Sequence, residues 1–140
     1  MSGTMSNYLQ AKILDYVMSD TSYSPPGTVY VALFTVAPTN AGGGTEASGG
    51  SYARAATTNN TTNWPASTGT SPTTKANGTV ITFTTATADW SSGSNMVAFA
   101  LFDALTSGNM LWWANLNESK PVLNGDTPSF AIGALTITQD

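Results

Sequence analysis

The chain has 140 residues and a mass of 14.5 kDa, which is enough for one folded domain with its own core and short for two. Only 9 % of the residues are charged against 41 % hydrophobic, and neutral polar side chains, among them 23 Thr and 15 Ser, replace the missing charges. The lack of Cys and His excludes disulfides, thiolate or imidazole metal ligands and a serine–histidine relay, and a net charge of −4 disfavours binding to nucleic-acid phosphates.

The first predicted element is a helix at about residues 6–18. Ser6 can cap its N-terminus, because the hydroxyl accepts a hydrogen bond from a free backbone N–H. Apolar side chains recur at helical spacing at Leu9, Ile13, Tyr16 and Val17. Tyr8 and Leu14 lie outside that row, so the helix is apolar over more of its circumference than one core contact requires. Either it makes a wide contact with its own domain, or part of it docks on another subunit.

The next element is a predicted strand at Thr28–Phe34, where β-branched and aromatic residues follow two prolines. Both alternating faces of this strand are apolar, whereas a sandwich strand normally has one face in water. We therefore expect the helix or a neighbouring chain to cover its second face.

Two long polar loops follow, at about residues 38–50 and 57–77, separated by a possible short strand at Tyr52–Thr58. The first is rich in glycine, and we expect it to be mobile or ordered only on contact. The second is long enough to be functional, disordered or ordered by a partner. Trp64 lies in it and is costly to leave in water, so we expect the indole to plug a groove.

A β pattern begins after the turn signal Asn77-Gly78. Successive strands are predicted at Val80–Thr84, Met96–Phe102, Met110–Leu116, Phe130–Ile132 and Leu135–Thr138, with the second and third forming a hairpin. Short strands divided by Gly, Asn and Pro are typical of antiparallel sandwiches. The sequence therefore predicts a mainly β fold: one antiparallel, jelly-roll-like β-sandwich domain over residues 1–140, with a single N-terminal α-helix.

The acidic residues give little support for a catalytic site or a calcium site. Asp89 and Asp103 flank the strand Met96–Phe102 and could pair as glycosidase carboxylates, but carboxylates at strand ends more often form turns. A calcium site at Asp103 or Asp126 lacks EF-hand spacing. We predict no enzyme activity, no catalytic residue, no cofactor and no metal site.

Trp112 and Trp113 are adjacent on a predicted strand, so their rings must point to opposite faces. One ring can fill the sandwich core, and the other needs a cover. That cover is another part of the chain, a protein partner, or a sugar stacked on the ring.

Six blocks of sequence resemble a family of small tailed-bacteriophage virion proteins whose members are often labelled phage tail fibre proteins. The blocks are YLQAKILDYV, TVYVALFTVAPTNAGGGTEASGGSYAR, TNNTTNWPA, ITFTTATADW, FALFDALTSGNMLWWANL and LNGDTPSFAIGALTITQD, together running from about Tyr8 to Asp140. The resemblance implies a non-enzymatic structural component of a phage particle. A long fibre shaft is not expected, because the chain has no heptads or fibrous repeat.

Our leading hypothesis is a capsid decoration or cement protein that bridges subunits of the phage major capsid protein. The alternatives are a small tail or tail-fibre component bound to tail proteins, and a carbohydrate-binding module at the particle tip. We expect a homo-oligomer in the virion, assembled in the bacterial host cytoplasm, with no nucleic-acid partner. No apolar run approaches ~18 residues, so we expect no membrane partner, and no signal peptide is apparent. The predicted interface residues are Leu9, Ile13, Tyr16, Trp64, Trp112 and Trp113.

Overall fold

The computed structural model describes residues 3–140, and the fold is mainly β with antiparallel strand pairs and one N-terminal helix, as predicted. The helix α1 spans Asn7–Ser19, and a 3-10 turn, η1, spans Trp90–Gly93. The strands are β1 (Thr4–Met5), β2 (Thr28–Val36), β3 (Thr45–Glu46), β4 (Ala55–Thr58), β5 (Thr73–Ala76), β6 (Ile81–Thr82), β7 (Asn95–Phe102), β8 (Met110–Pro121), β9 (Ser129–Phe130) and β10 (Thr136–Gln139).

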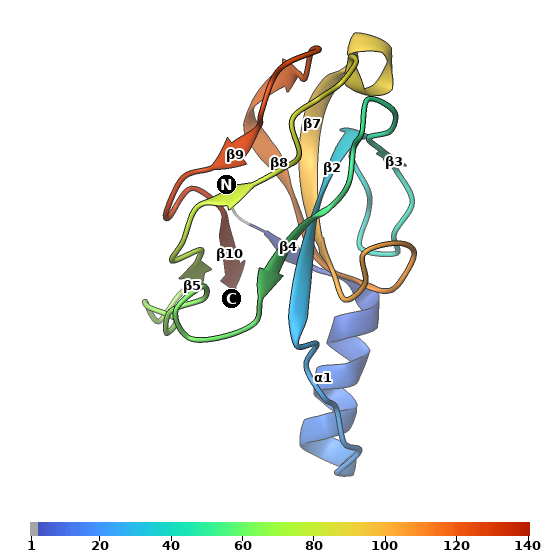
Figure 1. The fold of residues 1–140 in the computed structure, drawn as a ribbon. Helices are drawn as coiled ribbons and strands as arrows, with labels where there is room; N and C mark the ends of the chain where they lie inside the picture. The colour runs from blue at the N-terminus through green and yellow to red at the C-terminus, as the bar shows by residue number, and fades with distance from the viewer. Residues whose placement is uncertain (1–2) are drawn as a thin grey trace.

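The main sheet has the order β1-β8-β7-β2-β3, and β4 also pairs with β2. Its centre is formed by the three long strands β2, β7 and β8, which cross the molecule side by side (Figure 1). The predicted hairpin is confirmed as β7 and β8, and β8 continues five residues beyond the predicted end at Leu116. Small residues meet at the centre, where Ala32 of β2 pairs with Ala100 of β7.

Two short ribbons, β5–β10 and β6–β9, form the second layer and pack on one face of the main sheet (Figure 1). Phe130 of β9 meets Phe99 of β7 with ring centroids 5.8 Å apart. Leu135 and Ile137 bury their side chains in the same core as Val31 of β2. The result is a β-sandwich whose second layer is split, because the strands there are each only two to four residues long.

The opposite face of the main sheet carries a second apolar cluster, which includes Phe34 and Met110. Its cover was predicted to be the helix or a neighbouring chain. In the structure, the glycine-rich loop and the first turn of α1 border these two side chains. The loop is held by the chain's own hydrogen bonds, since Asn40 accepts one from the backbone N–H of Asn7 and one from the indole of Trp113. The loop, which was predicted to be mobile or ordered only on contact, therefore makes contacts within its own chain.

Gly44 explains how this loop lies so close to the sheet. Its φ is +77°, and a Cβ added there would lie 2.5 Å from the carbonyl oxygen of Val36. Only glycine fits such a position without strain. The glycine at this position thus allows the loop to pack closely against the end of β2.

The second predicted loop, 57–77, is partly regular, because its last residues form β5. Asn77 follows that strand and is 2 % exposed. Its amide donates to the carbonyls of Thr79 and Ala131 at 2.8 and 2.9 Å, and its carbonyl oxygen accepts from the backbone N–H of Leu135 at 2.9 Å. This one side chain therefore joins the chain before β6 to the turn that leads into β10.

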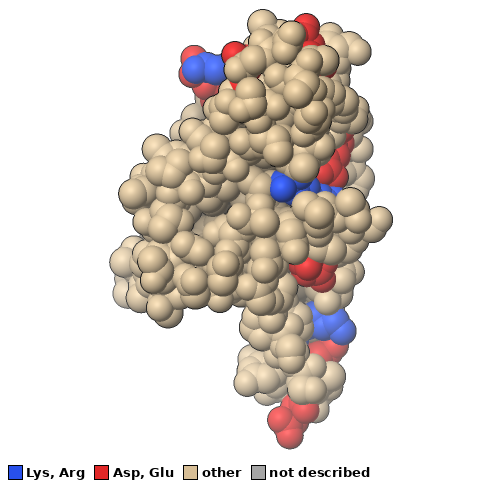
Figure 2. Space-filling model, in the orientation of Figure 1, with Lys and Arg blue, Asp and Glu red and all other residues tan. Residues whose placement is uncertain are grey.

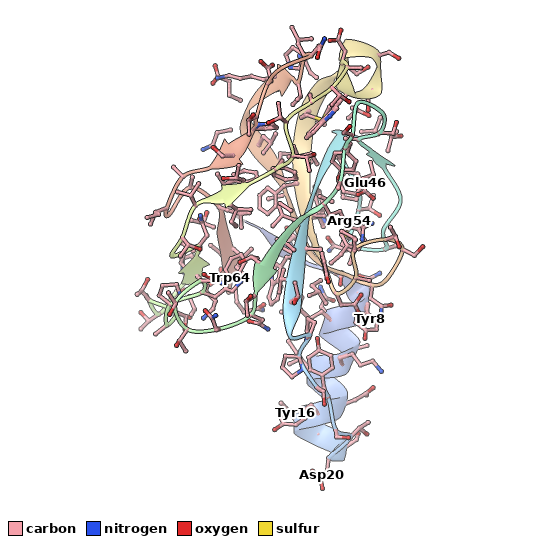
Figure 3. All side chains as sticks on the ribbon, in the orientation of Figure 1. Tyr8, Tyr16, Asp20, Glu46, Arg54 and Trp64 are labelled. Carbon is pink, nitrogen blue, oxygen red and sulfur yellow. The ribbon has the colours of Figure 1, made fainter. Side chains whose placement is uncertain are left out.

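A buried ion pair ties the edge of the main sheet to the β7–β8 turn. Arg54 is 8 % exposed and binds both carboxylate oxygens of Glu46 at 2.8 Å (Figure 3). The guanidinium also donates to the carbonyls of Ala104 and Ser107 and lies 3.7 Å from the centroid of the Phe102 ring. Such a pair is favourable only when further hydrogen bonds satisfy its donors, and the two carbonyls supply them to Nη1 here.

The helix formed by the described residues is too short and too polar to cross a membrane.

Replacing Asn77 with Ala should lower the free energy of unfolding by about 3 kcal/mol, because three buried backbone groups lose their partner. Urea unfolding followed by tryptophan fluorescence measures this change. Asn59→Ala is the matched control, since the exposed Asn59 amide makes one hydrogen bond, to the carbonyl of Pro26. Equal losses in the two variants would contradict the central role assigned to Asn77.

Candidate functional site

The helix α1 is attached to the sheet at its N-terminal end by Ser6, which is 2 % exposed. The Ser6 hydroxyl caps the helix by accepting from the backbone N–H of Leu9 at 3.2 Å, as predicted, and donates to the carbonyl of Met110. The Ser6 backbone N–H donates to the carbonyl of Leu111 at 2.9 Å. One residue therefore starts the helix and fixes that start to β8.

Beyond its first turns the helix projects from the sandwich (Figure 1). It ends at Asp20, which adopts a left-handed conformation and whose backbone N–H donates to the carbonyl of Asp15. Figure 3 places Tyr16 and Asp20 on the projecting half, away from the sheet. Leu9 is the buried residue of this helix.

The projecting half carries an apolar stripe, which we define as Ile13, Leu14, Val17 and Met18. Their exposed fractions are 38, 63, 67 and 80 %. At about 100° per residue, these four side chains lie within one broad face of the helix. Lys12 and Asp15 fall on the other side, and Figure 2 shows the charged atoms of the helix along its edge away from the β5–β10 ribbon. The stripe thus combines high exposure with an absence of charge.

A groove of about 520 Å³, which we call the helix groove, runs between the stripe and the β5–β10 ribbon. The exposed surface of its lining is mostly apolar, and Lys75 is the one charged residue in it. The residues that line it are Met5, Gln10, Ile13, Leu14, Ser67, Thr73, Thr74, Lys75, Trp112, Ile137, Thr138 and Gln139. The stripe and the groove share Ile13 and Leu14, so they form one continuous surface.

A smaller hollow of about 300 Å³ adjoins the groove and contains Tyr23 and Trp64. Burial raises the pKa of the Tyr23 phenol, and the charges of Tyr8 and Asp103 raise it further. The phenol therefore stays neutral well above physiological pH. The indole N–H groups of Trp64 and Trp112 are buried here without a hydrogen-bond partner among the described residues.

The six predicted interface residues lie in three different environments. Leu9 and Trp64 are 4 and 5 % exposed and belong to the main core, so Trp64 fills the chain's own interior. Ile13 and Tyr16 lie on the projecting helix, with Tyr16 58 % exposed. Trp112 and Trp113 point to opposite faces, as predicted. Trp112 packs on the main core and lines the helix groove, and Trp113 packs on the second cluster.

Sequence reasoning did not select Leu14, Val17 and Met18 as interface residues, although they are the most exposed part of the stripe. The available signal was that apolar residues extend around the helix beyond the row that begins with Leu9. Periodicity alone could not tell which of the two apolar faces lies against the sheet, because the answer depends on the anchor at Ser6.

The acidic residues considered for catalysis or calcium binding act in turns. Asp103 accepts two hydrogen bonds from Asn109, at 2.7 and 2.8 Å. Asp126 accepts from the backbone of Leu123, and Asp89 accepts from the backbone of Asn124. Among the residues that the structure describes, no three acidic, His or Cys side chains gather in a way that could hold a metal ion.

Comparison with known proteins identifies one family. The model of the family described as "Podophage GP4 fiber I protein gp80" matches residues 4–138, nearly the whole chain. No curated protein matches the chain.

Replacing Ser6 with Ala should lower the free energy of unfolding by about 1–2 kcal/mol, because the helix loses its cap and the Met110 carbonyl loses a donor. Amide hydrogen exchange in α1 should become faster than exchange in β7. Ser19→Ala, at the exposed end of the same helix, is the control and should change stability by at most about 0.5 kcal/mol. Unchanged exchange in α1 of the Ser6 variant would show that Ser6 does not anchor the helix.

Proposed function

The chain belongs to the family of the podophage GP4 fiber I protein gp80, and on that premise we propose that it is a structural component of a phage fibre, retained in the virion through the apolar stripe of α1. The match over residues 4–138 supports a virion component. The exposed apolar stripe supports binding to another virion protein, and the proposal rests mainly on this observation.

The chemistry of the stripe is suited to protein contact. Large exposed apolar side chains gathered on one projecting element mark interaction sites. Covering the stripe would remove apolar surface from water at about 25 cal/mol per Å². Because no charged side chain belongs to the stripe, such a contact would depend little on salt concentration. A particle that meets changing ionic conditions outside its host benefits from that independence.

A fibre location is favoured over decoration of the capsid, because the family is described as a fibre protein. The capsid-decoration hypothesis rests on the sequence alone. Both hypotheses share a non-enzymatic role, which the turn-forming contacts of Asp89, Asp103 and Asp126 support. Association with other virion proteins follows from either one, and assembly in the bacterial cytoplasm stays a prediction.

The carbohydrate-binding hypothesis needs a free aromatic ring. The indole of Trp113 packs on the second cluster and donates to Asn40 at 2.9 Å, and Trp112 packs on the main core. Both rings are therefore partly covered by the chain's own packing, which leaves less of each free for a sugar to stack on.

The location can be tested with a single gold label. Ser119 is exposed near the end of β8 farthest from α1, and the chain has no Cys, so Ser119→Cys supplies one reactive thiol. The gold-labelled variant is added to particles that lack the chain and imaged by electron microscopy. We expect gold on the tail fibres, with binding blocked by excess unlabelled chain. Gold spread over the head surface would overturn the fibre proposal in favour of capsid decoration.

A further inference from the structure

We propose that the hollow beside the helix groove binds a small aliphatic carboxylate, whose carboxylate group is held by the indole N–H groups of Trp64 and Trp112 and by Lys75. The hydrocarbon chain of the ligand lies along the apolar walls of the hollow. This inference goes beyond the proposed function, because a ligand of this kind needs neither a virion partner nor a fibre location.

The four tryptophans of the chain differ in what their indole N–H groups bind. The indoles of Trp90 and Trp113 donate to acceptors within the chain, both at 2.9 Å. The indole N–H groups of Trp64 and Trp112 are buried and have no hydrogen-bond partner among the described residues. Both of these residues line the same hollow. A buried donor without an acceptor is costly, so this hollow favours a ligand that brings an acceptor.

Lys75 makes the hollow suited to an acceptor that carries a negative charge. Its ammonium group donates to the carbonyl of Pro65 at 2.8 Å, which leaves two of its three N–H donors for a ligand. None of the described residues that line the hollow is acidic. Asp103 lies outside the lining, and both of its carboxylate oxygens already accept from Asn109. Two neutral donors and one positive charge, with no carboxylate beside them in the lining, favour an anion.

The walls of the hollow define the rest of the ligand. Its volume of about 300 Å³ is at the lower end of the range for small-molecule sites. Leu9 of α1, Val29 of β2, Leu101 of β7 and Leu111 of β8 all line it and are 3 to 7 % exposed. Buried aliphatic walls from the helix and from three strands suit a hydrocarbon chain and disfavour a polar body such as a sugar.

The rim of the hollow leaves a way in for a ligand. Ile13, Tyr23 and Pro25 also line it, and they are exposed or half-buried. The hollow adjoins the helix groove, with which it shares Lys75 and Trp112. The carboxylate therefore lies where the two cavities meet, and the hydrocarbon chain extends into the smaller one.

Nuclear magnetic resonance of the full-length chain, labelled with nitrogen-15, tests the site with decanoate as the probe. The resonances of the two indoles in the hollow are assigned from Trp64→Phe and Trp112→Phe. Decanoate, kept below the concentration at which it forms micelles, should shift both resonances in a saturable way. The resonances of Trp90 and Trp113 are internal controls and should stay in place, because those indoles already donate within the chain. Lengthening the probe from hexanoate to octanoate should tighten binding about fourfold for each added CH₂ group.

Lys75→Met tests the role of the charge, because it removes the ammonium group and keeps a long apolar side chain. This variant should raise the dissociation constant of decanoate at least about 10-fold. Lys120→Met is the matched control, since it removes the same charge from an exposed side chain near the other end of β8 and should leave binding unchanged. Circular dichroism verifies that both variants fold. Decylammonium, which has the same hydrocarbon chain and the opposite charge, should bind the wild-type chain at least about 10-fold more weakly than decanoate.

The inference is overturned if decanoate leaves the Trp64 and Trp112 resonances in place, or if it shifts the resonances of all four tryptophans alike. Equal binding of decanoate and decylammonium would also overturn it, as would equal binding of decanoate to the wild-type chain and to Lys75→Met. In either case the hydrocarbon chain alone would hold the ligand. The fibre proposal is decided separately, by the position of the gold label.

Discussion

The arrangement of the molecule depends on the attachment of α1 through Ser6. The hydroxyl and the backbone N–H of Ser6 donate to the carbonyls of two neighbouring residues of β8. The backbone N–H of Asn7 donates to the carbonyl of Asn40. All these contacts lie at one end of the helix. The other end is therefore free to project, and the apolar residues that follow Leu9 are exposed although they resemble a core-facing pattern. The position of the anchor therefore leaves one apolar face of an ordinary amphipathic helix in water.

Few charged side chains take part in the interactions of this molecule, either in its core or on the projecting helix. Inside, Arg54 is buried and pairs with the partly buried Glu46, and its Nη1 atom donates to two backbone carbonyls. Amides such as that of Asn77 hold turns together. On the projecting helix, neutral side chains leave hydrophobic burial as the main source of binding energy. Burial raises the pKa of the Tyr52 phenol, which donates to Glu46, so this group also stays neutral. Contacts of this kind change little with pH or salt.

Much of the fold could be predicted from local patterns. The cap at Ser6, the helix, the strand that begins at Thr28 and the β7–β8 hairpin follow from propensity, periodicity and turn residues. The ordered glycine-rich loop could not be predicted, because its position depends on long-range hydrogen bonds from Asn7 and Trp113 to Asn40. Trp64 was expected to plug a groove, and it is buried in the main core, where it also lines the hollow beside the helix groove. Of the predicted interface residues, Ile13 and Tyr16 lie on the exposed helix. The rest of the stripe could not be selected from the sequence, because the face of the helix that is exposed depends on where the helix is attached to the sheet.

The most direct test of the proposed contact role of α1 is the rate at which peroxide oxidises Met18. This rate is compared between the assembled virion and the isolated chain, diluted until it is monomeric. Met18 is 80 % exposed, whereas Met96 and Met110 are 2 and 7 % exposed and serve as internal controls. If the stripe is a contact surface, Met18 oxidises quickly in the diluted chain and is protected in the virion, and the two controls stay slow in both. Equally rapid oxidation of Met18 in the virion would show that the stripe remains in water and would contradict the contact role.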